Sequence, residues 1–182
     1  MSNQQHKPHI IISGGGLVGA LMACALGELD VHATLIEQAA TPPAGDINLL
    51  DTRSTALNAG TQKILANLGL WDAIAPHAAG IAAIHVSQAG HFGATRLYAK
   101  DAQIPALGYV VPNAALGRAC AARMAVLQAA SKLTVLQPAK LVTITQNTGG
   151  VQAKVHVNDA LDVVDGDMLI VAEGADSPTR TL

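Results

Sequence analysis

In the opening third of the chain, continuous apolar runs are separated by glycines or by charged residues. No charged side chain occurs from Ile10 to Gly27, and a second apolar run ends at Glu37. Isoleucines at the start of the first run predict a buried strand over residues 9–13, and the glycines that follow predict a tight turn. The alanine- and leucine-rich stretch over residues 20–29 predicts a helix. The pattern therefore indicates a strand, a glycine turn, a helix and a second strand that closes on an acid.

Beyond this unit the spacing of apolar positions switches repeatedly between helix-like and strand-like. Helix-like spacing predicts helices over residues 60–75, broken at 67–69, and over 114–130. Alternating or continuous apolar runs predict a hairpin, a short strand and a three-stranded antiparallel meander, at residues 81–87 with 92–98, at 108–111, and at 141–146, 151–157 and 161–164. Four further runs predict one parallel sheet: 9–13, 32–37, 133–137 and 168–172, the last buried on both faces. A ligand would bind at the carboxyl ends of these strands.

The glycines in the first turn have the spacing of a dinucleotide site, Gly14-x-Gly16-x-x-Gly19. In this spacing the first glycine permits the sharp turn, the second lets the backbone approach a pyrophosphate, and the third lets the helix pack against the sheet. The N–H groups of Leu17 and Val18 would point out of the helix start, where the helix dipole favours an anion. The alternative is a purely structural turn.

Glu37 follows the second strand, about 20 residues beyond the glycines. A carboxylate at this position accepts hydrogen bonds from ribose hydroxyls and repels a 2′-phosphate. We include the neighbouring Gln38 in the candidate site. The ligand expected here is FAD or NAD rather than NADP.

The same uncharged stretch, preceded by Lys7, also resembles a signal peptide or a membrane span. Three successive glycines in its middle argue against both. The chain then continues through Glu28 and Asp30 into another strand, as a soluble domain would. We therefore keep the dinucleotide interpretation.

Composition narrows the function class further. Half of the 182 residues are hydrophobic, 13% are charged and the mean hydropathy is +0.33, so the chain can bury one good core with a small appended lobe. The net charge of −2 and the four aromatic residues disfavour nucleic-acid binding. Cys24 and Cys120 lie in predicted helices without CxxC spacing and are interpreted as core residues. None of the seven histidines has zinc-site spacing, and no metal is expected.

Residues 41–45 read Thr-Pro-Pro-Ala-Gly and predict a loop, and Arg53 lies in the segment that follows. A planar guanidinium on a loop near a pyrophosphate can make bidentate contacts. The alternative for Arg53 is a solvated surface charge, and spacing alone does not separate the two.

Several motifs together resemble the FAD-dependent aromatic hydroxylases related to p-hydroxybenzoate hydroxylase, and among them the ubiquinone-biosynthesis hydroxylases that act on polyprenylated phenols. The resemblance covers nearly the whole chain. It is carried by the glycine turn with Glu37 and by residues 51–61, 86–93, 107–113 and 173–180. The last segment looks like the motif D-G-x-x-S-x-x-R of that family, although Glu173 stands in place of its Asp. Pro112 likewise stands where ubiquinone hydroxylases often have Glu.

The resemblance implies roles for further residues. Glu37 would hold the adenosine ribose, Arg53 would lie by the pyrophosphate or ribityl chain, and Arg118 would contact the cofactor from the helix after the 108–111 strand. In the last motif the candidates are Glu173, Gly174 and Asp176. The implied fold is α/β: a Rossmann-like FAD-binding domain over residues 1–182 with a parallel sheet, an antiparallel β-meander and part of a small substrate-domain β-sheet, to which residues 80–108 contribute.

The resemblance also implies an activity. FAD would be reduced by NAD(P)H, and dioxygen would supply the oxygen that hydroxylates a phenol. We nominate no catalytic side chain, because the cofactor carries this chemistry. The expected partners are an aromatic, prenylated substrate and a ubiquinone-synthesis complex, at a cytoplasmic or peripheral inner-membrane location. Because the family continues past the last motif, we expect an N-terminal part that is inactive in isolation. The alternatives are an NAD-binding dehydrogenase domain and a non-catalytic remnant.

Overall fold

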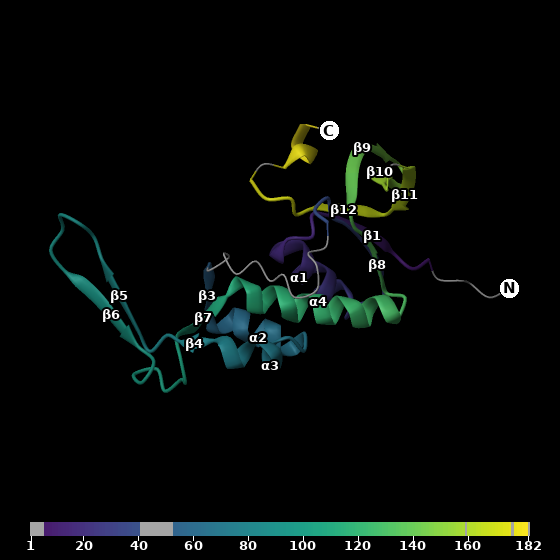
Figure 1. Ribbon diagram of the computed structural model, residues 1–182. Coiled ribbons are helices and arrows are strands. Elements are labelled where there is room, and N and C mark those ends of the chain that lie inside the picture. The colour runs from purple at the N-terminus through teal and green to yellow at the C-terminus, as the bar shows by residue number, and fades with distance from the viewer. Residues whose placement is uncertain (1–5, 41–52, 159, 176, 182) are drawn as a thin grey trace. The chain divides into compact units, whose positions relative to one another are not determined.

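The computed structural model describes residues 6–40, 53–158, 160–175 and 177–181 (Figure 1). Their contacts divide into two compact units, one formed by residues 6–40 and 120–181 and the other by residues 53–119. The predicted loop at residues 41–45 lies outside the described residues. Each unit contains two sheets.

The first unit is built on a four-stranded parallel sheet in the order β12-β1-β2-β8. The strands are β1 (His9–Ser13), β2 (His32–Ile36), β8 (Leu133–Leu136) and β12 (Met168–Val171). This arrangement confirms the predicted sheet and its four segments. Parallel order places the carboxyl ends of all four strands at one edge.

Successive residues of β1 and β2 pack on opposite faces of this sheet, because side chains alternate along a strand. Ile12 and Leu35 pack with helix residues such as Ala23 of α1 (Leu17–Leu26) and Leu127 of α4 (Asn113–Ala129). Ile11 lies in a separate core with strands of the meander. Two buried layers therefore explain why the run Ile10 to Ile12 is apolar at every position.

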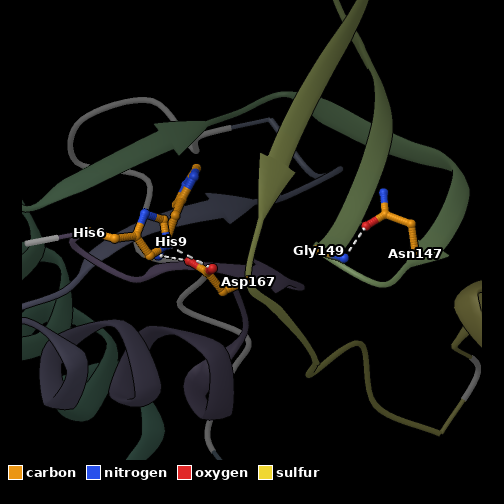
Figure 2. Close-up of polar contacts among 5 residues, drawn as sticks. All are labelled: His6, His9, Asn147, Gly149 and Asp167. Atoms are coloured by element: carbon orange, nitrogen blue, oxygen red, sulfur yellow. Dashed lines mark hydrogen bonds and ion pairs between the residues drawn. The ribbon is translucent and has the colours of Figure 1, made fainter.

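The predicted antiparallel meander is present as β9 (Ala139–Asn147), β10 (Gly150–Val157) and β11 (Ala160–Gly166), paired in the order β11-β10-β9. The β9–β10 turn is held by Asn147, whose side-chain oxygen accepts a 2.8 Å hydrogen bond from the N–H of Gly149 (Figure 2). Fully buried Ala153 and Val155 face the core shared with Ile11. The meander thus covers one face of the parallel sheet, and the helices cover the other.

The expectation that residues 168–172 are buried on both faces is wrong. Met168 is 54% exposed and Val171 is 46% exposed. The reason is position, since β12 lies at the end of the described sheet and pairs there with β1. The parallel pairing itself was predicted correctly.

Histidines gather at the amino end of β1, where β11 leads into β12. The Asp167 carboxylate accepts a 2.7 Å hydrogen bond from the backbone N–H of His9 and lies 2.8 Å from Nε2 of His6 (Figure 2). The His9 ring packs 5.0 Å from the His32 ring and bonds the Thr34 hydroxyl. The pKa of His9 is lowered, mainly because the ring is partly buried and also because His32 lies beside it. These contacts fasten the start of β1.

Cys24 of α1 and Cys120 of α4 are fully buried free thiols. The contact with Cys120, followed by burial, raises the pKa of the Cys24 thiol. The predicted role of both cysteines as small core residues in helices is confirmed. In the described part of the chain, no helix is both long enough and apolar enough to cross a membrane.

The second unit contains a three-stranded antiparallel sheet in the order β3-β7-β4 and a separate hairpin, β5-β6. Its elements are β3 (Ser54–Asn58), α2 (Ala59–Asn67), α3 (Trp71–Ile74), η1 (Ala75–His77), β4 (Ala79–Gly80), β5 (Ala83–Ser87), β6 (Ala94–Tyr98) and β7 (Gly108–Pro112). The predicted helix break, hairpin and short strand are confirmed. Strands β3 and β4 were missed, and Arg53 directly precedes the first of them.

Helix α2 begins at a side-chain cap. The Asn58 side-chain oxygen accepts a 2.8 Å hydrogen bond from the N–H of Thr61. Replacing this residue, Asn58→Ala, is expected to lower the free energy of unfolding by about 1 kcal/mol, because the N–H loses its acceptor. Urea denaturation measures the change. The control is Asn67→Ala at the other end of α2, and equal losses in both variants would contradict the capping argument.

Candidate functional site

The turn after β1 depends on the backbone of Gly14. Its φ of +101° lies in the region that favours glycine. A Cβ at this position would lie 2.7 Å from the carbonyl oxygen of Ala172. The Gly14 N–H donates a 2.8 Å hydrogen bond to the carbonyl of Ile36. The chain therefore leaves β1 sharply, as the glycine spacing predicts, with the end of β12 close beside the turn.

Gly19 lets helix α1 lie directly against this turn. It is buried, and a Cβ built on it would lie 1.8 Å from the carbonyl oxygen of Gly14 and 3.5 Å from the Cβ of Ala172. The first contact is far shorter than any real Cβ contact, so only glycine fits without moving the backbone. The third glycine of the motif thus sets the distance between helix and turn.

Gly16 has the opposite surroundings. It is the N-cap residue of α1, with φ −61° and ψ −177°, and a Cβ built on it would meet nothing within 4 Å. Neither an acidic residue in the first turn nor a side-chain cap occurs in this helix, which the structure describes in full. Leu17 and Val18 follow, and Val18 is 67% exposed. Open space in front of an uncapped helix N-terminus fits an anionic pyrophosphate.

Glu37 organises the loop around this helix start. Its Oε2 accepts a 2.5 Å hydrogen bond from the N–H of Gly15, and its Oε1 accepts a 2.6 Å bond from the N–H of Ala39. Each carboxylate oxygen has a second lone pair, so a ribose hydroxyl can still donate to it. The structure therefore places Glu37 beside the glycine turn, and the exposed Gln38 comes next.

Gly15 was not among the predicted site residues. A Cβ on it would lie 2.9 Å from the Cβ of Glu37, so the missing side chain and the N–H both keep Glu37 in place. The run of three glycines was visible in the sequence. The dinucleotide spacing accounts for Gly14 and Gly16 but not for Gly15 between them.

Glu173, two residues beyond β12, is surrounded by donors from the protein itself. Its Oε1 accepts hydrogen bonds from the hydroxyls of Ser13 at 2.5 Å and Thr179 at 2.6 Å. Its Oε2 accepts bonds from the Ser177 hydroxyl at 2.6 Å and the Thr179 N–H at 3.2 Å. Burial raises the pKa of Glu173, but these bonds together outweigh it and the pKa is lowered. The surrounding donors therefore favour the ionised form of Glu173.

A cavity of about 190 Å³ lies in the first unit next to these groups. Its lining combines the glycine turn, both glutamates and the start of the meander: Ser13, Gly14, Ile36, Glu37, Gln38, Ala139, Lys140, Leu141, Glu173 and Pro178. Strand ends from β1 and β2 converge here, at the carboxyl edge of the parallel sheet, where the sequence predicted a ligand. The meander residues of the lining were not predicted, because the sequence does not show which strand ends meet.

The remaining predicted residues do not line this cavity or lie outside the residues that the structure describes. Gly174 follows Glu173 with φ +83°, in the region that favours glycine. Arg53 and Arg118 are exposed and belong to the second unit, so their place beside a cofactor stays a prediction. Asp176 lies outside the described residues. Within the residues described, no three His, Cys, Asp or Glu side chains lie together as a metal site would require.

Comparison with known proteins points to the same ligand. Residues 7–182 match the family model described as FAD binding domain. Ubiquinone hydroxylase UbiL of Rhodospirillum rubrum is 32% identical over 178 residues, which are 95% of this chain and 40% of that protein. The 3-demethoxyubiquinol 3-hydroxylase of Escherichia coli is 27% identical over 100% of this chain and 44% of its own length. The chain thus spans less than half of these curated relatives.

The fold is similar to that of a solved hydroxylase and a solved monooxygenase. The anhydrotetracycline hydroxylase OxyS of Streptomyces rimosus has a TM-score of 0.77 at 17% identity, covering 97% of this chain and 34% of that one. The p-nitrophenol 4-monooxygenase PnpA of Pseudomonas putida has a TM-score of 0.74 at 19% identity, covering 94% and 42%. This likeness confirms the predicted α/β fold with one parallel sheet and additional antiparallel sheets.

Proposed function

The chain belongs to the FAD-binding domain family, and on that premise we propose that it is the FAD-binding part of a monooxygenase that hydroxylates a phenolic ring. The finer proposal is that the substrate is a polyprenylated phenol of ubiquinone biosynthesis. It is supported by the names of two curated relatives, a ubiquinone hydroxylase and a 3-demethoxyubiquinol 3-hydroxylase. The chain spans 40% and 44% of those proteins, and the isolated chain is proposed to be inactive.

The observation that carries the proposal is the open N-terminus of α1 with Glu37 beside it. Gly16 leaves room for a pyrophosphate at the helix start, and Glu37 offers an acceptor to a ribose hydroxyl. Gly14 and Gly19 shape the turn, and Leu17 and Val18 contribute N–H groups. We propose that the remaining candidates Gln38, Arg53, Arg118, Gly174 and Asp176 contact the same cofactor.

Bound FAD would supply the redox chemistry, with NAD(P)H as electron donor and dioxygen as the source of the transferred oxygen. The task of this chain is to bind and orient the adenine dinucleotide end. Ile36, Ala139 and Leu141 supply an apolar part of the cavity wall.

Residues 80–108 are proposed to contribute to a substrate lobe. The β5–β6 hairpin within them exposes large apolar side chains, among them Val86 at 57%, Phe92 at 109% and Leu97 at 49%. Exposed apolar surface of this kind marks an interaction or ligand-binding face. A prenylated substrate would bring the protein to the inner face of the membrane as a peripheral protein, and a ubiquinone-synthesis complex is the proposed partner.

Titration of the chain with FAD and, separately, with NADH tests the proposal. Saturable quenching of flavin fluorescence is expected, with little NADH binding. Glu37→Ala should weaken FAD binding about tenfold, because a charge-assisted hydrogen bond to the ribose is lost and Gly15 loses its acceptor.

The matched control is Asp72→Ala, which removes an exposed carboxylate from α3 in the other unit. It should bind FAD like the unaltered chain. Tight NADH binding without flavin affinity would instead identify an NAD-binding dehydrogenase domain. Failure of the folded chain to bind either nucleotide would contradict the proposal.

A further inference from the structure

The carboxylate of Glu173 joins the end of β1, which is distant in sequence, to the short helix that follows Glu173 by a few residues. Ser13 ends β1, Glu173 follows β12, and Thr179 belongs to the short helix η2 (Pro178–Thr181). Ser13 is 2% exposed and Thr179 is 8% exposed, so both hydroxyls are buried polar groups that require a partner. One carboxylate satisfies both of them.

We propose that Glu173 is a positioning residue for the dinucleotide site, which holds η2 against the end of β1, and that it does not contact the cofactor directly. This inference rests on the proposed FAD function and deepens it, because it assigns the motif residue at position 173 a different task from that of a ligand.

The count of hydrogen bonds supports this assignment. Four donors from three residues approach the two oxygens at 2.5 to 3.2 Å, two on each oxygen. A carboxylate has about four acceptor sites in all. With these sites occupied, Glu173 offers little to a ligand, and a second negative charge beside a pyrophosphate would repel it.

The connection to the glycine turn shows how Glu173 can act at a distance. Ser13 immediately precedes Gly14, and the carbonyl of Ser13 accepts a 2.7 Å hydrogen bond from the N–H of Ala172. Pro178 of η2 lines the same cavity as Gly14 and Glu37. Release of the carboxylate would therefore loosen the cavity wall at Pro178 and the strand end that leads into the turn.

Two variants separate positioning from direct contact. Glu173→Gln keeps the length of the side chain but replaces one acceptor oxygen with a donor group that faces donors. Thr179→Val removes the hydroxyl that donates to Glu173 and keeps the size of the buried side chain. The matched control is Thr181→Val on the same helix, whose hydroxyl bonds the carbonyl of Pro178 instead.

FAD affinity is measured by flavin fluorescence, and amide hydrogen exchange is measured over residues 177–181 and over β10. Positioning predicts that Glu173→Gln and Thr179→Val each weaken FAD binding about tenfold, with the double variant no weaker than Glu173→Gln alone. Exchange should accelerate at residues 177–181 in both variants while β10 stays protected. Thr181→Val should change neither measurement.

Loss of FAD affinity in Glu173→Gln with normal affinity in Thr179→Val would identify a direct ligand and overturn the inference. If the unaltered chain binds no FAD, the proposed function fails by itself. The exchange data then decide the role of Glu173, because unchanged exchange at residues 177–181 in both variants would overturn the positioning role.

Discussion

A Gly19→Ala variant is expected to lose about 3 kcal/mol of folding free energy and, with it, detectable FAD binding. The added Cβ would lie 1.8 Å from the Gly14 carbonyl oxygen. Both groups belong to the backbone or are attached directly to it, so no side-chain rotation relieves the overlap. Helix α1 must move away from the turn, and the buried contact of Ala23 with Leu35 and Leu127 in the same core is lost with it. Chemical denaturation followed by circular dichroism measures the loss.

Gly16→Ala is the matched control, since the same methyl group is added three residues earlier where it meets nothing within 4 Å. Its backbone angles are ones that alanine adopts readily. This variant should unfold at the same denaturant concentration as the unaltered chain. Equal stability of the Gly19 and Gly16 variants would show that the helix does not sit against the turn as described.

The features that the sequence predicted well are local or periodic. Three isoleucines before three glycines define the end of β1, and the spacing from Gly14 to Gly19 lies within one turn and the start of one helix. Such features follow from backbone sterics and from the alternation of side chains along a strand. The position of Glu37 followed as well, because parallel neighbours in a βαβ unit end at the same edge of the sheet.

The features that were missed depend on partners far away in the chain. Glu173 and Ser13 are 160 residues apart, and nothing in either segment indicates that one accepts a bond from the other. Strand β3 is short and has small polar residues, and it forms because β7, about fifty residues later, pairs with it from Ser54↔Pro112 onward. The exposure of Met168 similarly depends on how many neighbours β12 has. Sequence pattern indicates that a strand forms, but not which strand covers it.

A larger side chain at the open position, Gly16→Val, is expected to lower FAD affinity roughly 100-fold while leaving stability unchanged. The φ and ψ of Gly16 are extended, so valine fits the backbone, and open space surrounds its Cβ. The methyl groups would then occupy the volume in which phosphate oxygens approach the N–H groups of Leu17 and Val18. Several charge-assisted hydrogen bonds would be lost together, without any strain in the protein.

Flavin fluorescence titration and thermal denaturation on the same samples measure both quantities. Leu29→Ala, a change at an exposed position beyond the other end of α1, is the surface control and should leave both unchanged. The two glycines then give opposite results from the same motif, since Gly19 is required by the fold and Gly16 by the ligand. Normal FAD affinity in Gly16→Val would place the pyrophosphate away from this helix, because no phosphate could share that volume with a valine side chain.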